Sequence, residues 1–213
     1  MIVVKCEQGT DAWRKARLGV VTGSGFASLL TNKTLKPSEQ AKAYMAKLVA
    51  ETLIGEPIEE PGSAFMDRGT EMEPEARGWY EFAQGVDVEQ VGFITTDDGR
   101  VGCSPDGLVG EDGGLELKCP AAHTHAAYAM DPDALVLAYR GQVQAGLYVT
   151  GRAWWDIVSY NPVMEPVLVR VLPDPTYRAA LEPVLAKFLA DMDAALARMR
   201  PAVSARRDSN PLT

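Results

Sequence analysis

The alternating segment Leu115-Glu116-Leu117-Lys118-Cys119 limits the fold of this chain more than any other part of its sequence. Alternation of apolar and charged residues is typical of a β-strand, because successive side chains point to opposite faces of a sheet. Leu115, Leu117 and Cys119 then face a core, and Glu116 and Lys118 share the other face. Charged groups inside an apolar strand are costly unless they are paired or used. The segment therefore predicts a strand that carries a functional charge pair.

A second carboxylate lies ten residues earlier, in the turn Ser104-Pro105-Asp106-Gly107. The intervening Gly-rich hairpin can fold Asp106 back beside Glu116. Two carboxylates can hold a hard cation such as Mg²⁺ through oxygen, and Lys118 can orient a water beside it. A metal in such a site lowers the pKa of bound water and neutralises charge in phosphodiester hydrolysis. The pattern is short, however, and Pro-Asp turns and surface Glu/Lys pairs are common.

Composition limits the class of protein. The chain has 213 residues with 46% hydrophobic and 23% charged residues, which is ordinary for one soluble globular domain. No apolar run is long enough for a membrane span, and the start lacks the pattern of a signal peptide, so we expect no membrane association. Three cysteines exclude a disulfide scaffold and a four-cysteine zinc or iron–sulfur site within the chain, and they favour the cytoplasm.

The net charge of −8 argues by itself against a nucleic-acid partner. The acidic excess is local, because residues 61–118 contain 13 Asp or Glu and only 4 Lys or Arg. Most of these carboxylates fit a solvated acidic surface. A few of them could instead form a metal site, since clustered carboxylates repel one another unless a cation bridges them.

Periodicity predicts a mixed α/β domain, in which helices precede a run of short strands and a helix then crosses over to further strands. We expect one domain over residues 1–200 and a disordered tail over 201–213. Thr22 or Ser24 is the expected N-cap of the second helix. The predicted helices cover residues 9–17, 24–30, 38–53, 68–83, 132–149 and 174–199, and the predicted strands cover 86–94, 100–104, 107–109, 114–119, 153–160 and 166–172.

Several further segments extend the pattern over nearly the whole chain. They are Glu7-Gln8-Gly9-Thr10-Asp11-Ala12-Trp13, Arg17 to Ser24, Gly69-x-x-x-Glu73-x-x-Ala76-Arg77, Glu81-Phe82, Gly85-Val86-x-Val88, Cys103 to Leu108, Leu115 to Pro120, Gln142-Val143-Gln144, Ala153-Trp154 and the acidic helix from Lys187 to Leu196. With these segments, in this order, the chain resembles the lambda exonuclease family, also called the YqaJ-type viral recombinase nucleases, of the PD-(D/E)xK superfamily. The resemblance implies a restriction-endonuclease-like core, with a central mixed β-sheet flanked by helices.

The resemblance also implies a set of active-site residues. Asp106 and Glu116 match metal-binding carboxylates, the Leu117 carbonyl would complete one metal shell, and Lys118 matches the catalytic lysine. Glu73 matches a carboxylate that serves a second metal, although it could be a solvated residue of the acidic run. Gln142 matches a glutamine that lies near the attacking water in the family. It could instead be a polar residue on a helix face.

A pocket for a terminal 5′-phosphate is implied by Arg17, Ser24 and Ser104. An arginine offers a bidentate fork to phosphate, and a serine that opens a helix presents its hydroxyl and a backbone N–H to an anion. The alternatives are a simple N-cap for Ser24 and a carboxylate partner for Arg17.

Three other residues are weaker candidates for DNA contact. Met66 falls where the family places a hydrophobic wedge between base pairs, and it could instead pack under the following helix. Lys33 and Lys36 are candidates for contact with the DNA backbone only because their loop is basic. For His123 and His125, the sequence favours surface or packing roles over metal binding.

The activity implied by the resemblance is a Mg²⁺-dependent 5′→3′ exonuclease, with Mn²⁺ as a substitute, that acts on linear double-stranded DNA. It would release mononucleotides from 5′-phosphorylated ends and leave 3′ single strands for recombination. The family further implies a homotrimeric ring, a single-strand annealing partner, and a phage or prophage product in the cytoplasm of a bacterial host. An endonuclease or repair nuclease of the same superfamily, and a catalytically inactive scaffold that binds DNA ends, remain alternatives.

Overall fold

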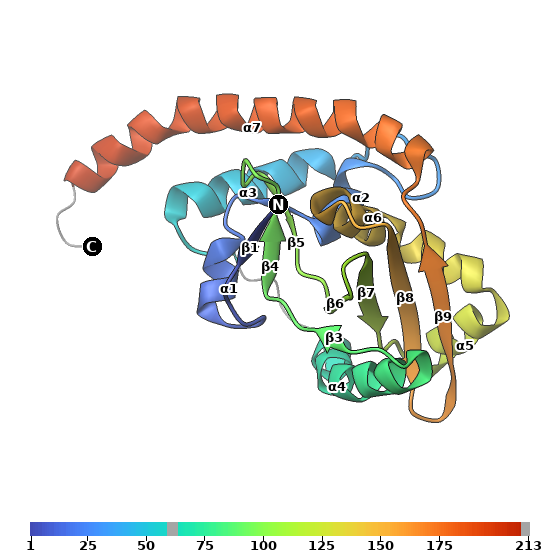
Figure 1. Cartoon of the computed structure of the whole chain (residues 1–213). Coiled ribbons are helices and arrows are strands. Elements are labelled where there is room, and N and C mark those ends of the chain that lie inside the picture. The colour runs from blue at the N-terminus through green and yellow to red at the C-terminus, as the bar shows by residue number, and fades with distance from the viewer. Residues whose placement is uncertain (59–63, 210–213) are drawn as a thin grey trace.

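The structure is a computed structural model that describes residues 1–58 and 64–209, with side chains described for 1–58 and 71–200. Figure 1 shows the order of its elements. The helices are α1 (Asp11–Ala16), the short 3-10 helix η1 (Gly23–Gly25), α2 (Phe26–Leu29), α3 (Ala41–Ile54), α4 (Ala64–Gln84), α5 (Ala122–Met130), α6 (Pro132–Thr150) and α7 (Pro175–Ser209). The strands are β1 (Ile2–Val4), β2 (Val21–Thr22), β3 (Val88–Glu89), β4 (Phe93–Thr95), β5 (Val101–Cys103), β6 (Gly107–Val109), β7 (Gly113–Lys118), β8 (Trp154–Asn161) and β9 (Met164–Val171).

The strands form two sheets, which confirms the predicted mixed α/β fold. The smaller sheet has the order β1-β4-β5-β2, and the larger has the order β3-β6-β7-β8-β9. Within the larger sheet β6 and β7 are antiparallel, whereas β7 and β8 are parallel and are connected through α5 and α6. The predicted crossover helix therefore places β8 beside the alternating strand β7.

Helices cover both faces of the larger sheet. Leu115, Leu117 and Val158 point towards α4 and form a buried cluster with Ala76 and Tyr80 of that helix. The opposite face packs against α6, where Trp155 and Ile157 of β8 join buried residues of the helix. Because β7 has its apolar residues on the α4 face, Glu116 and Lys118 are left on the α6 face.

The long helix α7 closes the other side of the core. Figure 1 shows it lying across α3, with its C-terminal end projecting beyond the rest of the chain. Its buried residues recur at intervals of three or four and pack with α2, α3 and the smaller sheet; they are Tyr177, Leu181, Leu185, Phe188, Met192 and Leu196.

The end of α7 differs from the prediction. The sequence predicts a helix that stops before Pro201, but α7 continues to Ser209, so residues 201–209 of the expected tail are helical. Strong helix formers, Ala195–Met199, precede this proline, and packing holds the earlier turns of α7 on the core, so Pro201 does not end the helix. Residues 210–213 lie outside the described residues. The single domain over 1–200 stays a prediction.

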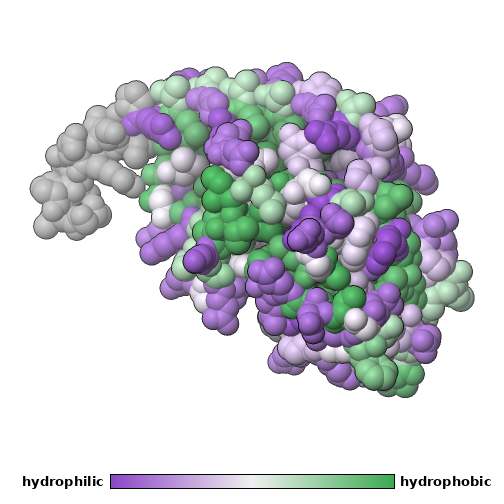
Figure 2. Space-filling model, in the orientation of Figure 1, coloured by the Kyte–Doolittle hydropathy of each residue, from purple (hydrophilic) through white to green (hydrophobic). Residues whose placement is uncertain are grey.

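Three local features also differ. The sequence missed β1, whose Ile2 and Val3 are about half exposed (48% and 47%); Figure 2 shows apolar side chains gathered over this part of the surface. It also missed α5, an alanine-rich helix without a capping side chain. Neither Thr22 nor Ser24 caps α2 through its side chain, because the 3-10 helix η1 comes first and Gly25 is the N-cap. No described helix is long and apolar enough to cross a membrane.

An ion pair between the buried Asp156 and the half-exposed Arg170 ties the edge strand β9 to the sheet. Asp156 of β8 is fully buried and accepts bonds from Arg170 Nε and Nη2 at 2.8 Å and from the Tyr80 hydroxyl at 2.7 Å. Arg170 also lies 3.7 Å above the centre of the Trp154 ring.

We predict that Arg170→Met lowers the free energy of unfolding by about 2 kcal/mol, less than for a fully buried pair because Arg170 is half exposed, since it leaves the buried Asp156 carboxylate without its counter-charge. The matched control is Arg178→Met, which removes an exposed pair with Glu182 and should cost less than about 1 kcal/mol. Urea unfolding followed by circular dichroism measures both. Equal losses in the two variants would contradict a special role for the Asp156 pair.

Candidate active site

The pairing of β6 with β7 places Asp106 next to Glu116. Gly107 is the register partner of Leu115. One residue before β6, the backbone N–H of Asp106 donates to the Leu115 carbonyl at 3.1 Å. The Asp106 carboxylate in turn accepts from the N–H of Leu117 at 2.6 Å. The hairpin thus folds back as the sequence predicted and holds Asp106 across the strand from the charge pair.

Glu116 and Lys118 form an ion pair on the α6 face of β7, with 2.6 Å between Lys118 Nζ and Glu116 Oε1. Gln142 of α6 donates its side-chain N–H to the same carboxylate oxygen. Lys118 Nζ also lies 4.9 Å from the centre of the Tyr139 ring. The Glu116 side chain is 4% exposed and that of Lys118 is 20% exposed, so this cluster is almost dry. Chemistry that develops charge here is poorly screened by water.

Three carboxylates share this region. Burial raises the pKa of Glu116, and the nearby negative charges of Asp106 and Glu73 raise it further against the opposing effect of Lys118. Burial likewise raises the pKa of Asp106. For Glu73 on α4, burial and then the charge of Asp106 raise the pKa to about 7.

Lys118 is the counter-charge of this cluster. Burial alone would lower its pKa, but the charges of Glu116 and Asp106 outweigh this effect and raise the pKa above the usual value. Lys118 is therefore protonated at neutral pH. The carboxylates still outnumber this buried cation, and a divalent ion would relieve their mutual repulsion.

The donor set suits a hard cation that keeps part of its water shell. No group of three or more His, Cys, Asp or Glu side chains in the described residues is arranged so that it could hold a metal ion. Asp106 and Glu116 lie side by side because of the backbone pairing of β6 with β7. Mg²⁺ is commonly held by one or two carboxylates together with waters and substrate oxygens, so these two residues fit it. Leu117 lies between the two charged residues of β7 with its side chain buried.

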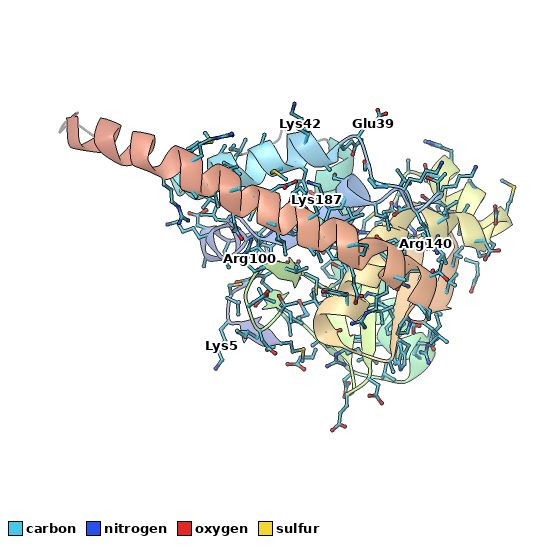
Figure 3. All side chains as sticks on the ribbon, turned by 90° about the horizontal axis from the view of Figure 1, so that it is seen from above. Lys5, Glu39, Lys42, Arg100, Arg140 and Lys187 are labelled. Atoms are coloured by element: carbon cyan, nitrogen blue, oxygen red, sulfur yellow. The ribbon has the colours of Figure 1, made fainter. Side chains whose placement is uncertain are left out.

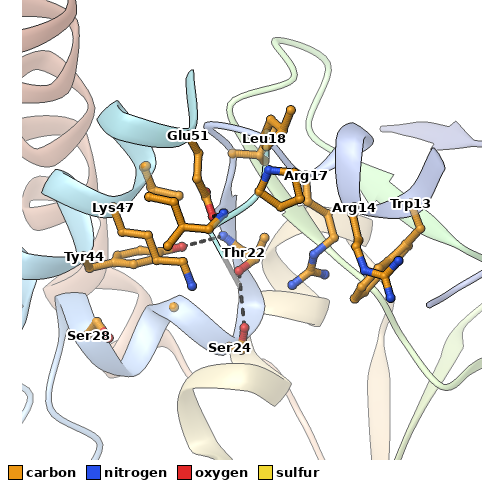
Figure 4. A pocket seen from close by; sticks show the side chains of 15 residues that line it. Trp13, Arg14, Arg17, Leu18, Thr22, Ser24, Ser28, Tyr44, Lys47 and Glu51 are labelled. Atoms are coloured by element: carbon orange, nitrogen blue, oxygen red, sulfur yellow. Dashed lines mark hydrogen bonds between the residues drawn. The ribbon is translucent and has the colours of Figure 1, made fainter. Parts of the chain in front are cut away.

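Arg17 and Ser24 line a pocket of about 630 Å³ (Figure 4). Arg17 ends α1 and donates to the Ser104 hydroxyl at 2.9 Å. The indole N–H of Trp13 donates to the same hydroxyl at 2.8 Å, and the Arg17 guanidinium lies 4.2 Å from the Trp13 ring centre. Ser24 is exposed and lies 3.3 Å from the Thr22 hydroxyl.

The pocket and the carboxylates belong to one site. Ser104 precedes Asp106 by two residues, so one turn carries a residue of each group. From the other side, Gly23 of η1 packs closely on α6, where an added Cβ would lie 3.4 Å from Ala145 and 3.6 Å from the Gln142 carbonyl. The structure thus gathers the predicted residues Arg17, Ser24, Ser104, Glu73, Asp106, Glu116, Lys118 and Gln142 in one region; their functional roles stay predictions.

The remaining candidates are not gathered there. Lys33 and Lys36 are exposed on the loop between α2 and α3 and do not line the pocket. Met66 belongs to α4, but its side chain lies outside the described residues. His125 is fully buried, with its ring nitrogens 2.9 Å from the Ser159 hydroxyl and 3.1 Å from the Glu165 carbonyl, which agrees with the predicted packing role.

Three residues of the site were not assigned a role from the sequence. Trp13 bonds Ser104, Tyr139 lies against Lys118, and Arg77 donates to the backbone carbonyl of Asp106 at 3.3 Å. Each is three or four residues from a predicted site residue on the same helix or at its end: Trp13 from Arg17, Tyr139 from Gln142, and Arg77 from Glu73. Helical spacing around a candidate would therefore have found all three.

Comparison with known proteins gives the family. The sequence pattern of the YqaJ-like viral recombinase domain matches residues 12–153, and the chain belongs to this family. A solved relative is the alkaline exonuclease LHK-Exo from Laribacter hongkongensis, with 34% identity over 92% of this chain and 99% of that chain, and a TM-score of 0.79. The same exonuclease in complex with dAMP has a TM-score of 0.78 at the same identity and coverage.

A more distant structure shares the fold. The phage-related exonuclease from Haemophilus somnus 129PT is 13% identical, covers 84% of this chain and 96% of that chain, and has a TM-score of 0.67. No curated protein matches the chain. The predicted resemblance to the lambda exonuclease family is confirmed, and the fold is that of these phage-type exonucleases.

We predict that the metal-free protein loses stability as the pH rises from about 4.5 to about 7, in part through Glu73. In this window the unfolded state releases the proton of Glu73 before the folded state does, so ionisation favours unfolding. Glu73→Gln should therefore stabilise the protein by about 1 kcal/mol at pH 8 in the presence of EDTA, a value reduced by solvent screening, and should change little near pH 4.5.

Denaturant unfolding at the two pH values tests this expectation. Glu71→Gln is the matched control, because Glu71 is exposed on the same helix. If Glu73→Gln and Glu71→Gln show the same pH dependence as the wild type, Glu73 does not feel the carboxylates of the site.

Proposed function

We propose that this protein is a Mg²⁺-dependent 5′→3′ exonuclease that acts on linear double-stranded DNA, releases mononucleotides from 5′-phosphorylated ends and leaves 3′ single strands for recombination. The observation that carries the proposal is the junction at Ser104–Asp106. One turn joins a cationic pocket suited to a terminal phosphate to a carboxylate–lysine cluster suited to hydrolysis. Family membership and the likeness to LHK-Exo support a nuclease.

Asp106 and Glu116 would hold Mg²⁺, with the Leu117 carbonyl as a further ligand and Glu73 serving a second ion. The bound metal would activate water and neutralise charge on the phosphate in the transition state. Mn²⁺ is an expected substitute, because it also accepts oxygen ligands. The excess of buried carboxylates over cations supports this assignment.

Lys118 and Gln142 would position the attacking water. Because the pKa of Lys118 is raised, its ammonium stays protonated and donates hydrogen bonds instead of accepting a proton. Gln142 donates a hydrogen bond to the Glu116 carboxylate, which also pairs with Lys118, so the glutamine and lysine side chains are held at one carboxylate. Both residues can then stabilise the hydroxide form of water through hydrogen bonds, and the ring of Tyr139 limits where the ammonium can lie.

Arg17, Ser24 and Ser104 would bind the terminal 5′-phosphate. The guanidinium is fixed by Ser104 and by the Trp13 ring, so little side-chain entropy is lost on binding. The relative LHK-Exo forms a complex with dAMP, a deoxynucleoside monophosphate of the kind that a mononucleotide-releasing exonuclease produces. Met66 as a wedge between base pairs, and Lys33 and Lys36 as backbone contacts, are parts of the same proposal.

A homotrimeric ring around DNA would resolve the conflict with the net charge of −8. In a ring, acidic surface lies outside and at the metal sites, while cationic residues face the channel. We further propose a single-strand annealing protein as a partner and a phage or prophage origin, with activity in the cytoplasm of a bacterial host. Membership of the viral recombinase family supports these proposals.

End-labelled linear duplex and closed circular duplex, each with Mg²⁺, test the proposal directly. We expect mononucleotides from the linear duplex and no product from the circle. Cleavage of the circle would favour an endonuclease or repair nuclease, and failure to cleave either substrate would favour an inactive scaffold that binds DNA ends.

We predict that Lys118→Ala retains DNA binding and lowers the cleavage rate by about 10²–10³-fold, because one charged hydrogen-bond donor to the hydroxide form of the attacking water is lost. Single-turnover cleavage and gel-shift binding with a 5′-phosphorylated duplex measure the two effects. Lys187→Ala, a change on the exposed face of α7, is the matched control. A near-normal cleavage rate in Lys118→Ala would show that the site is assigned wrongly.

We predict that Arg17→Ala removes the preference for 5′-phosphorylated over 5′-hydroxyl ends. Charge-assisted hydrogen bonds contribute on the order of 1.5–3 kcal/mol, so the rate on phosphorylated ends should fall at least about tenfold. Activity on hydroxyl ends should change little, and Arg17→Lys should rescue only partly, since a point charge lacks the planar fork. An equal loss on both ends would assign Arg17 to the fold or to general DNA affinity.

A further inference from the structure

The chain crosses between its two sheets twice, and the second crossing carries Asp106. Because β3 belongs to the larger sheet and β4 to the smaller one, residues 90–92 form the first crossing. The chain returns from β5 to β6 through residues 104–106. The two crossings run side by side, because β3 pairs with β6 at one end and β4 with β5 at the other (Figure 1). The place of Asp106 therefore depends on how the crossings are held.

Regular strand pairing is interrupted where the chain crosses. Among the described strands, the pairing of the two segments stops at Leu108 in the larger sheet and resumes at Cys103 in the smaller one. Pro105 lies in this gap and is buried. It has no N–H of its own to donate, and its buried carbonyl needs a donor. The donor must come from another part of the chain.

Gln8 supplies this donor and joins the two crossings. Its side-chain amide nitrogen donates to the Val91 carbonyl of the first crossing at 2.9 Å. The same nitrogen donates to the Pro105 carbonyl of the second crossing at 2.8 Å. An amide nitrogen carries two hydrogens, so both are used. One side chain therefore ties the crossings together at the residue before Asp106.

The segment that carries Gln8 lies tightly against the first crossing. A Cβ added at Gly92 would lie 1.9 Å from the Cys6 carbonyl, so this approach leaves no room for a side chain. The segment is also at the edge of the molecule, where Figure 3 shows Lys5 pointing outwards, and Gln8 is exposed. Backbone packing thus places the amide of Gln8, and a change of its end group does not disturb the core.

Arg77 of α4 holds the next carbonyl, that of Asp106 itself. Its Nη2 donates to this carbonyl at 3.3 Å. The Nε atom of Arg77 is buried, which limits the freedom of the guanidinium. Burial raises the pKa of both Glu73 and Asp106, and the positive charge of Arg77 is among the effects that oppose this rise. The guanidinium therefore lies close to the carboxylates while it bonds the backbone of one of them.

We propose that Gln8 and Arg77 are positioning residues that hold the backbone of Pro105 and Asp106 and thereby raise the affinity of the Asp106–Glu116 pair for a divalent cation. The inference rests on the proposed function, in which these two carboxylates hold Mg²⁺. Gln8 acts through the Pro105 carbonyl and Arg77 through the Asp106 carbonyl. A carboxylate on a fixed backbone loses less freedom when it binds a cation than one on a loose turn, so it binds more tightly.

Electrostatics and positioning predict opposite effects for two substitutions. Gln8→Glu keeps the shape of the side chain, loses both N–H donors and adds a negative charge, which by itself would attract a cation. Arg77→Met removes a positive charge close to the carboxylates, and electrostatics alone would again tighten cation binding. Loss of positioning instead weakens cation binding in both variants. The direction of the change therefore separates the two explanations.

The test is calorimetric titration of the DNA-free protein with Mn²⁺, which measures affinity without any cleavage. We expect Gln8→Glu and Arg77→Met each to raise the dissociation constant for Mn²⁺ by about tenfold, as for the loss of a residue that orients a metal ligand. The matched controls are Gln84→Glu and Arg178→Met, which make the same charge changes at exposed positions. Their dissociation constants should stay within about twofold of the wild-type value.

Cleavage of a blunt 5′-phosphorylated duplex gives a second readout. For Gln8→Glu, the Mg²⁺ concentration that gives half the maximal rate should rise by about tenfold, while the rate at saturating Mg²⁺ should stay within about threefold of wild type. A merely structural role would lower the urea midpoint and leave the cation affinity of the folded protein unchanged. Gln8→Met loses the donors without adding a charge and should also weaken Mn²⁺ binding, so the test holds even if Arg77→Met does not fold.

Mn²⁺ binding that is unchanged or tighter in Gln8→Glu and Gln8→Met would overturn the positioning role. A wild type that binds no Mn²⁺ would overturn the metal site of the proposed function and this inference with it. A wild type that binds Mn²⁺ but does not cleave DNA would overturn the proposed exonuclease alone, because the calorimetric comparison still decides the role of Gln8 and Arg77.

Discussion

The antiparallel pairing of β6 with β7 is the interaction on which the site depends. The backbone bond from Asp106 to Leu115, and the bond from Leu117 to the Asp106 carboxylate, hold Asp106, just before β6, beside Glu116 of β7. Backbone geometry imposes this approach against the repulsion of two like charges. Without the hairpin, Asp106 and Glu116 would separate into water, and Lys118 would lose the charges that surround it.

Burial strengthens the electrostatic interactions within this arrangement. The apolar residues of β7 pack under α4, and α6 covers the face that carries Glu116 and Lys118, so the charges lie in a nearly dry space between layers. Desolvation opposes ionisation of the carboxylates, while Lys118 opposes that effect. The same burial that makes the cluster costly to fold makes any cation bound there a strong partner.

In the proposed function, the position of the pocket beside Arg17 relative to the carboxylates would set which bond is cut. Ser104 bonds Arg17, which lines the pocket, and Asp106 belongs to the cluster, so in the proposed function the short turn between them would fix the spacing between a terminal phosphate and the next one along the strand. On the other side, the close approach of η1 to α6 at Gly23 fixes Ser24 relative to Gln142. The spacing therefore depends on backbone contacts and not on long flexible side chains.

Much of the fold is predictable because it follows local rules. Alternation over residues 115–119 indicates the strand and its two faces, helical spacing indicates α1, α3, α4, α6 and α7, and short motifs in order carry the resemblance to the viral recombinase nucleases. The errors lie where local signals are weak. The strand β1 is three residues long and depends on β4 for its pairing, and α5 has no capping side chain. A proline alone does not end α7, because packing holds the preceding turns on the core.

Residue type and spacing alone are enough to name Asp106, Glu116 and Lys118 as the candidate set for the chemistry. Their surroundings, in contrast, come from the packing of distant elements. Trp13 and Arg17 reach Ser104 from about 90 residues away in the chain, and Gln142 reaches Glu116 from another helix. The pocket lined by residues of α1, α2 and α3 is likewise a product of packing. The physical reason is that a sequence pattern encodes the direction of a side chain along its own element, whereas burial, pKa and pocket shape depend on which elements pack together.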